Sequence, residues 1–326
     1  MSNLLCVGTA GMSVWFSRDN GETWIRPYIE SGLYLEARVW ALSAHPQRPG
    51  EVLAGTDSGL YRWNEGDQKW THLPSVLDDY DIWSMAQAPD DPDTIVVGTQ
   101  PANIFISIDG GKSFAPTKGS FADACIFVGK PRVTQILFDP IDKDTLWAGV
   151  EIDGVHRSTD HGRTWKKVGQ GINSEDIHGV AIVKEEGVKN GGKLVYATTN
   201  RGLNVSRDNG ETFAFQELDS PWQYTRTIVP RADGDKTVFL TNGNGPPGST
   251  GRLLRSRDYG ATFEDAGLPG TLNSTPWTVA THPSDPKLIF VCSNLGQSFR
   301  STDGGESWTK LAREFGEVRS SIWQAL

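Results

Sequence analysis

Cysteine, long apolar runs and a leader segment are scarce or missing in this chain of 326 residues. Its three cysteines, Cys6, Cys125 and Cys292, show no metal-ligand spacing and leave an odd one out, which predicts reduced, mostly buried thiols. No apolar stretch is long enough to cross a bilayer, so we expect no membrane contact. The chain enters a strand pattern at once, without a basic segment or an apolar leader, and this predicts a cytoplasmic protein.

Positive charge is also in deficit. The chain has 31 Lys and Arg against 40 Asp and Glu, a formal net charge of −9, and the basic residues are scattered. A surface that binds nucleic acid needs a basic excess, so we expect no nucleic-acid partner. Neither a glycine-rich phosphate loop nor a Ser–His–Asp pattern stands out. We therefore expect no cofactor. His178, Glu151 and Asp176 could together hold a metal ion, but no motif spacing supports such a site.

Glycine and tryptophan, by contrast, are abundant, with 36 and 12 residues. An eight-residue pattern, Ser-x-Asp-x-Gly-x-Thr/Ser-Trp/Phe, recurs along the whole chain, and its acidic positions are separated by steps of 44 to 51 residues. A repeat of this length between strand-like flanks predicts a propeller or a related array. The copies are Ser17–Trp24, Ser107–Phe114, Ser158–Trp165, Ser206–Phe213, Ser256–Phe263 and Ser301–Trp308, with a degenerate copy at Trp63–Trp70 that has Glu65 in the acidic position.

The chemistry of the pattern is that of a hairpin turn. In the first copy, the side chains of Ser17 and Asp19 can accept from backbone N–H groups, and Gly21 can adopt a backbone angle that other residues resist. Trp24 can bury a large apolar surface. Seven metal-binding aspartates are the alternative, but calcium loops gather several carboxylates, whereas most copies here have one. We therefore interpret the pattern as structural.

The pattern resembles the Asp-box, or BNR-repeat, of the sialidase-like family, and the resemblance covers nearly the whole chain. It implies an all-β fold, a seven-bladed β-propeller of four-stranded blades. Relatives include sialidases, xyloglucanases, sortilin-type receptors and a photosystem II assembly factor, so the fold does not settle the function. The Phe-Arg-Ile-Pro motif of sialidases is missing. Xyloglucanases of this type use a cleft between two propellers with one acid from each, whereas the repeats here make one propeller.

The repeats predict one domain, residues 1–326, in which the last strand joins the first blade and closes the ring. Closure removes sheet edges that would otherwise be free to aggregate. The expected blades are 4–27 with 317–326, 36–74, 81–117, 132–169, 176–217, 222–266 and 275–311.

Aligning the seven innermost strands on their turn prolines predicts one ring of side chains around the axis. Its members are aromatic or polar, and they would either pack between blades or line a pocket that stacks on a sugar or aromatic ligand. They are Trp40, Trp83, Thr134, His178, Tyr224, Trp277 and Trp323.

Two residues earlier on the same strand faces, the alignment gives a second, more charged ring: Arg38, Asp81, Arg132, Asp176, Trp222, Thr275 and Ser321. The alternation of Arg and Asp suits mutual pairing. Alternatively, Arg38 and Arg132 could hold a carboxylate or a similar anion. A long connection, 242–251, and an insertion, 117–130 with Phe127, are expected near the same mouth and are candidates to cover it.

The candidate catalytic residues are His178, Asp176, Glu151 and Asp81, because a histidine beside carboxylates can act as an acid or base near neutral pH. A hydrogen-bonded packing role for His178 is the structural alternative. The main hypothesis is an intracellular hydrolase or lyase acting on a small anionic or aromatic molecule in the central channel. The alternatives are a non-catalytic propeller that binds a protein partner, and a glycoside hydrolase using two of the three carboxyls.

Overall fold

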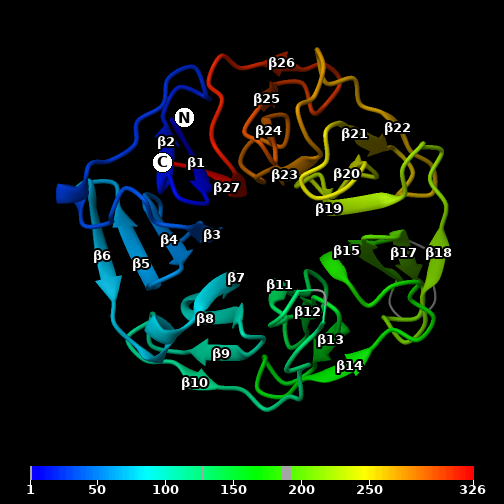
Figure 1. Ribbon diagram of the computed structural model, residues 1–326, viewed down its shortest axis with the longest axis horizontal. Helices are drawn as coiled ribbons and strands as arrows, with labels where there is room; N and C mark the ends of the chain where they lie inside the picture. Colours follow the sequence, from blue (N-terminus) through cyan, green and yellow to red (C-terminus); the bar gives the residue numbers. More distant parts are fainter. Residues whose placement is uncertain (1, 127, 186–191) are drawn as a thin grey trace.

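The computed structural model describes residues 2–126, 128–185 and 192–326, and it shows seven antiparallel sheets arranged around one axis (Figure 1). In each sheet the strands follow one another from the axis to the rim, except in the blade that contains both termini. Besides strands there are two short 3-10 turns, η1 (Ile29–Ser31) and η2 (Val76–Asp79). The fold predicted from the repeats is confirmed.

The first three blades in chain order contain the following strands. Blade one has β1 (Asn3–Thr9), β2 (Val14–Ser17) and β27 (Val318–Ala325). Blade two has β3 (Val39–Ser43), β4 (Glu51–Thr56), β5 (Gly59–Asn64) and β6 (Lys69–Leu73). Blade three has β7 (Asp81–Ala88), β8 (Asp91–Gln100), β9 (Ile104–Ser107) and β10 (Ala115–Pro116).

The remaining four blades repeat the four-stranded plan. Blade four has β11 (Val133–Phe138), β12 (Leu146–Val150), β13 (Gly154–Ser158) and β14 (Lys166–Val168). Blade five has β15 (Ile177–Lys184), β16 (Lys193–Thr199), β17 (Gly202–Ser206) and β18 (Ala214–Gln216). Blade six has β19 (Tyr224–Pro230), β20 (Val238–Gly243), β21 (Gly251–Ser256) and β22 (Glu264–Asp265). Blade seven has β23 (Pro276–Ala280), β24 (Ile289–Ser293), β25 (Ser298–Ser301) and β26 (Thr309–Lys310).

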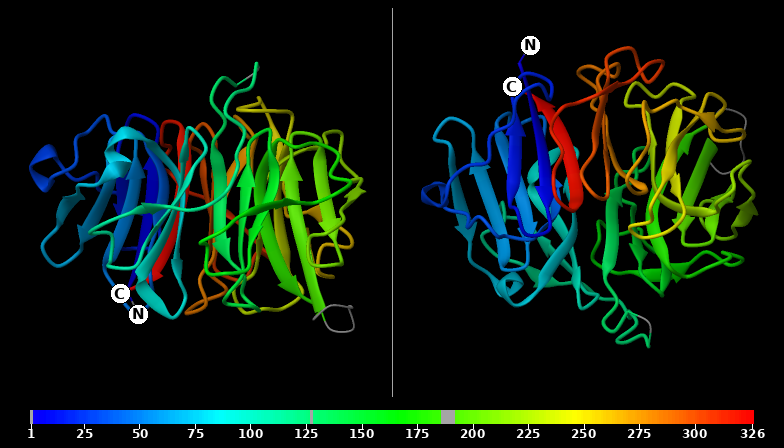
Figure 2. Two further views of the ribbon diagram at one scale, coloured as in Figure 1. Left: turned by 90° about the horizontal axis from the view of Figure 1, so that it is seen from below. Right: turned by 45° about the horizontal axis from the view of Figure 1, so that its top comes forward.

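The C-terminal strand closes the ring. β27 lies innermost in blade one and pairs antiparallel with β1, with Leu5 opposite Trp323 and Cys6 opposite Ile322. The two termini accordingly lie together at one end of the ring (Figure 2). One detail differs from the expected plan: blade one has three strands, and its outermost strand is reduced to a single bridge between Phe16 and Ile25.

The Asp-boxes form the expected turns. In the first box the Ser17 hydroxyl accepts from the Gly21 N–H at 2.8 Å and donates to Asp19 at 2.8 Å. The other carboxylate oxygen of Asp19 accepts from the Thr23 hydroxyl at 2.6 Å. Gly21 has a φ of 93°, in the left-handed region that favours glycine. The degenerate copy differs, because Glu65 accepts from the indole of Trp63 and pairs with an arginine of blade one.

The hydrophobic core is divided among the seams between blades. Seven clusters of buried apolar side chains are found in the described residues, and each is shared by two neighbouring blades. The aromatic residue of each complete box packs into the seam with the preceding blade, as Trp165 and Phe213 do. Cys6 and Cys292 are fully buried in adjacent seams, whereas Cys125 is half-buried. Burial of apolar surface along these seams is what holds the blades together.

Glycines in the second strand of four blades allow the next blade to approach. A Cβ added to Gly55 would lie 2.4 Å from Ile82 of blade three, and one added to Gly149 would lie 2.7 Å from Ile177 of blade five. Gly8 and Gly98 meet the next blade in the same way. The inner strands are therefore packed more tightly than any side chain at these positions would permit. In the described residues no helix has the length and apolar character needed to cross a bilayer.

This packing predicts that Gly55→Ala destabilises the protein. The added methyl group would overlap Ile82 and Met85, and overpacking of this kind costs about 1–3 kcal/mol of unfolding free energy. Thermal and denaturant unfolding would measure the loss. Gly66→Ala is the matched control, since its nearest atom is Asn64 Oδ1 at 3.2 Å. Equal stability of the two variants would contradict the tight approach of the inner strands.

Candidate functional site

A β-bulge interrupts the innermost strand of every blade at the same level. In blade two the pairing passes from Val39–Thr56 to Ala41–Gly55, so Trp40 is the extra residue. In blade six two residues, Arg226 and Thr227, are set between the pairs made by Thr225 and Ile228. A bulge takes a side chain out of the regular alternation of a strand and re-aims it, and bulges are frequent next to active sites.

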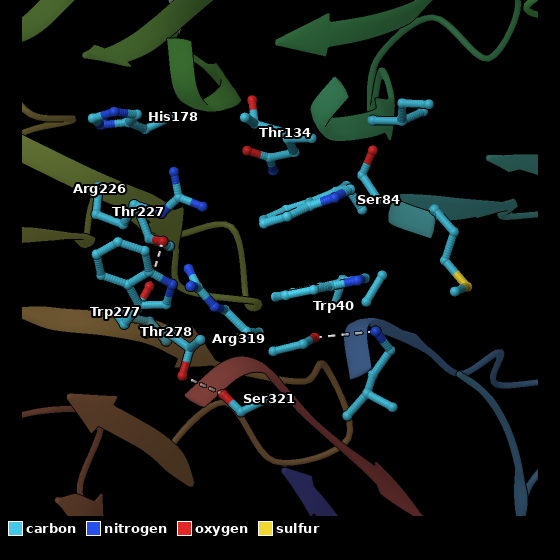
Figure 3. Close-up of a pocket in the computed structure, with 18 of the residues that line it drawn as sticks. Trp40, Ser84, Thr134, His178, Arg226, Thr227, Trp277, Thr278, Arg319 and Ser321 are labelled. Atoms are coloured by element: carbon cyan, nitrogen blue, oxygen red, sulfur yellow. Dashed lines mark hydrogen bonds between the residues drawn. The ribbon is translucent and has the colours of Figure 1, made fainter. Parts of the chain in front are cut away.

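The bulged residues form a ring that lines an axial cavity of about 260 Å³ (Figure 3). Each blade contributes a member of this bulge ring to the cavity wall. The members are Trp40, Trp83, Thr134, His178, Arg226, Trp277 and, on the closing strand, Arg319.

The bulge ring corrects the predicted axial ring at two of its seven positions. Tyr224 lies on β19 two residues before Arg226 and is buried. Its ring lies 5.0 Å from that of His178. Trp323 lies further along β27, where its ring is tilted by 48° against that of His282 at 4.8 Å and lines a second cavity of about 240 Å³. β27 has no proline on which to align it, and the bulge of β19 contains two residues where the other blades have one, so both strands were aligned out of register.

One wall of the axial cavity is aromatic. The rings of Trp40 and Trp83 stack 4.3 Å apart with an interplanar angle of 11°. The guanidinium of Arg132 lies 4.0 Å from the Trp83 ring on its other side. Across the cavity, the guanidinium of Arg226 lies 4.5 Å from the ring of Trp277. Aromatic faces of this kind can stack on a sugar or another flat ligand.

The polar members of the bulge ring link adjacent blades. Thr134 donates to the carbonyl of Ile177 in the next blade at 2.8 Å. Nδ1 of His178 donates to the carbonyl of Thr225, again in the next blade, at 2.7 Å. The packing interpretation of His178 thus accounts for one of its two ring nitrogens. Its Nε2 lies 3.4 Å from the carboxylate of Asp176.

Charged residues surround the mouth above the bulge ring. Arg132 donates to Glu151 at 2.6 Å, and the backbone N–H of Glu151 binds the carbonyl of Arg132 at 2.9 Å. In blade two, Asp57 makes the same backbone contact with Arg38 at 3.1 Å. The predicted pairing therefore exists for Arg132, but its partner is Glu151 from the adjacent loop rather than an aspartate of the ring.

The three carboxyls at the mouth have shifted pKa values. Burial raises the pKa of Glu151 against the opposing charge of Arg132, and Asp176 adds to the rise. Burial opposes ionisation of Asp176 too, but His178 and the nearby guanidinium groups lower its pKa below the ordinary value. Burial, with Asp57 nearby, raises the pKa of Asp81.

Burial also lowers the pKa of His178, although Asp176 works against the shift. In the described residues no three His, Cys, Asp or Glu side chains converge as a metal ion requires. The chemistry available at the mouth is therefore that of neighbouring carboxyls beside an imidazole and guanidinium groups.

Two connections border the mouth. The loop 242–251 is fastened to blade seven, because Thr275 donates from its hydroxyl to the Gly245 carbonyl at 2.7 Å. The insertion 117–130 is held by the loops of blades three and four, through the bond from Gln100 to the Lys130 carbonyl and that from the Ala122 N–H to Asp153. It projects outward from the face of the ring (Figure 2). Phe127 lies outside the described residues.

Comparison with known proteins identifies the family of the repeat. The model of the BNR/Asp-box repeat matches residues 299–310, which contain the last complete box, and five further boxes have the same sequence pattern. The chain is a BNR/Asp-box β-propeller. Among curated proteins, this propeller is 27% identical to an oligoxyloglucan-reducing end-specific xyloglucanase of Emericella nidulans over 84% of its own length. It spans only 40% of that enzyme.

Solved structures give the same fold. A GH74 enzyme of Niastella koreensis superposes with a TM-score of 0.63 at 21% identity, covering 83% of this propeller and 45% of the enzyme. A structure described as YCF48 bound to D1 peptide superposes with a TM-score of 0.56 at 14% identity, covering 85% of this propeller and 81% of that chain. The second match spans most of both chains, whereas the xyloglucanase-type relatives are much longer than this propeller.

Sequence reasoning missed Arg226 and Arg319 as cavity residues. A usable signal was present, because the residue before each bulge is apolar or small, and in four blades it packs against a glycine in the second strand of the preceding blade. Alignment on this residue places both arginines correctly. These residues are Val39, Ile82, Val133, Ile177, Thr225, Pro276 and Val318.

The raised pKa of Glu151 predicts how its replacement affects stability. A carboxyl whose pKa is higher in the folded state stabilises that state at low pH and loses the contribution as pH rises through the folded pKa. We expect Glu151→Gln to melt at a higher temperature than the original protein at pH 7 and at a similar temperature at pH 4. Glu175→Gln, at an exposed neighbouring carboxyl, is the control. A lower melting temperature of Glu151→Gln at pH 7 would contradict the shift.

Proposed function

We propose that the protein is a glycoside hydrolase whose sugar site is the mouth of the axial cavity. Glu151 is the general acid and Asp176 is the ionised partner that acts as base or nucleophile. The observation that carries the proposal is the placement of two carboxyls from successive blades at the mouth, Glu151 hydrogen-bonded to Arg132 at 2.6 Å and Asp176 at 3.4 Å from His178, with pKa values shifted upward for Glu151 and downward for Asp176. Opposite displacement of two adjacent carboxyls is what acid and base roles in glycoside hydrolysis require.

The surroundings explain why the two carboxyls differ. The carboxyl of Glu151 is 6% exposed, and although its Oε1 accepts from Arg132, its Oε2 has no hydrogen-bond partner in the described part of the chain. Asp176 also has one buried oxygen without a partner, but it is more exposed, at 17%, and has the imidazole of His178 beside it. The upward shift of the Glu151 pKa favours the acid role, and the downward shift of the Asp176 pKa favours the role of ionised base or nucleophile.

The aromatic wall supports a sugar as the ligand. Trp40 and Trp83 present a stacked pair to the cavity, Trp277 lines the same cavity, and Arg132 connects Trp83 to Glu151. Sugar rings have apolar faces that pack well against indoles, and their hydroxyl groups bind carboxylates and guanidinium groups. His178 lies beside Asp176, with its Nε2 3.4 Å from the carboxylate.

The comparisons support this hypothesis over an enzyme for small anionic or aromatic molecules, for which they offer no support. The curated relatives include xyloglucanases, and a GH74 enzyme is among the solved structures with the same fold. Because the propeller spans less than half of these relatives, the proposal assigns both carboxyls to one ring. A polysaccharide or an oligosaccharide of the xyloglucan class is the first substrate to test.

The test is the release of reducing ends from xyloglucan oligosaccharides and related glycans. Glu151→Gln should lower kcat by about 10²–10⁴-fold, because the leaving group loses its proton donor. Activity of the original protein should fall at high pH as Glu151 ionises and at low pH as Asp176 becomes protonated, and the alkaline limb should disappear in Glu151→Gln.

Two controls keep this test specific. Glu175→Gln changes an exposed carboxyl next to Asp176 and should retain full activity. Asp176→Asn should lose most of its activity. The pH profile of the remaining activity should still fall at high pH, because Glu151 is unchanged. Unchanged hydrolysis by Glu151→Gln, or no hydrolysis of any glycan by the original protein, would refute the proposal.

A further inference from the structure

The axial cavity has two guanidinium groups and no carboxylate among the described residues of its wall. Arg226 comes from blade six and Arg319 from the closing strand of blade one, and both side chains point into the same space (Figure 3). The carboxyls Glu151 and Asp176 do not line this cavity. Acidic groups thus occupy the mouth, and basic groups occupy the space beneath it.

Arg226 differs from Arg132 and Arg255, whose guanidinium groups form hydrogen bonds within the fold. Arg132 donates to Glu151, and Arg255 binds a backbone carbonyl and a glutamate. In the described part of the chain the guanidinium of Arg226 has neither a hydrogen bond nor an ion pair. It lies 4.5 Å from the ring of Trp277, and the charges of Glu151 and Asp176 act on it from the mouth without direct contact. Its five N–H donors are therefore available to a group inside the cavity.

Arg319 is only partly satisfied. One terminal nitrogen donates to Glu317, while its Nε is buried without a partner. Burial lowers the pKa of Arg319 to about 10, and the charges of Arg226 and Arg132 contribute, although Glu317 opposes them. Like charges held near one another below the surface destabilise the protein unless an anion lies between them.

We propose that Arg226 and Arg319 form an anion subsite in the axial cavity that binds the carboxylate of an acidic sugar, a uronic acid unit of the glycan. The sugar ring packs against Trp40 and Trp277, which lie beside the two guanidinium groups. Planar guanidinium groups bind carboxylates through paired hydrogen bonds, which makes the recognition directional. The assignment of a sugar rests on the proposed function, whereas the anion site rests on the arginines alone.

The size and layout of the cavity fit this assignment. Its volume of about 260 Å³ is below the roughly 300–1,000 Å³ of pockets for drug-sized ligands, so it suits one sugar unit rather than a chain. A unit held by its carboxylate at Arg226 and Arg319 leaves its glycosidic bond directed to the mouth. Glu151 and Asp176 stand there, so the anion subsite would select the terminal unit on which they act.

The experiment compares binding of glucuronate, glucose and acetate to the purified protein by calorimetry at low and moderate salt. Glucuronate should bind about 10- to 100-fold more tightly than glucose, and more weakly as salt increases. Arg226→Gln should remove this preference. Arg207→Gln is the control, since it removes the same charge from an exposed side chain at the rim and should leave binding unchanged.

Arg226→Gln also has a readout that does not depend on a ligand. Because the guanidinium has no polar partner, the variant should melt no lower than the original protein, and a lower melting temperature would assign Arg226 a structural role instead. Arg319→Gln is the second variant, and it should likewise weaken glucuronate binding.

The outcomes separate the subsite from the hydrolase. Equal binding of glucose and glucuronate, or an equal loss in Arg207→Gln, would overturn the anion subsite and leave the carboxyl assignments intact. Acetate binding as tight as glucuronate binding would overturn the sugar. Glucuronate binding that depends on Arg226, in a protein that hydrolyses no glycan, would support the subsite and refute the proposed hydrolase.

Discussion

The antiparallel pairing of β27 with β1 is the interaction on which the rest of the structure depends. It joins the two ends of the chain, so the seven innermost strands share one axis and the axial cavity has a complete wall. It also removes the free inner edge that blade one would otherwise expose. Arg319 lies on this closing strand, so the same pairing that stabilises the ring brings a charged group to its centre. Stability and the composition of the site are therefore linked through a single strand.

The second constraint is the close approach of neighbouring inner strands. Glycines in the second strand of four blades leave room for the apolar residue that precedes the next bulge, as Gly55 does for Ile82. That apolar residue packs in the seam between two blades. The bulge then directs the side chain of the next residue toward the axis. A regular strand would alternate between the two seams and present little to the centre. The β-bulge repeated in every blade therefore places one side chain from each blade in the wall of the axial cavity.

Electrostatics separates the site into two levels. Carboxyls stand at the mouth, where Glu151 and Asp176 are driven apart in pKa by burial and by unequal neighbours. Guanidinium groups lie below, where Arg226 contacts the ring of Trp277 but forms no hydrogen bond or ion pair in the described residues. Charged groups that pair within the fold, such as Lys193 with the buried Asp139, have their hydrogen-bonding needs met and stabilise the fold. Groups left without partners at the axis are the ones that a ligand would satisfy.

The sequence by itself determined the fold, because each Asp-box is a local turn whose Ser, Asp, Gly and aromatic residue lie within eight positions and need no distant partner. The spacing of the boxes determined the number of blades, and the strand left over at the C-terminus determined the closure. It also placed Trp40, Trp83 and Trp277 at the axis, since each precedes a strand-closing proline by the same interval, and it placed His178 there by the same alignment. Only the tertiary structure decided that Arg226 and Arg319, rather than Tyr224 and Trp323, complete the ring. The reason is physical: a bulge is fixed by how two blades pack, and that packing joins residues of different repeats, as it joins Gly55 to Ile82.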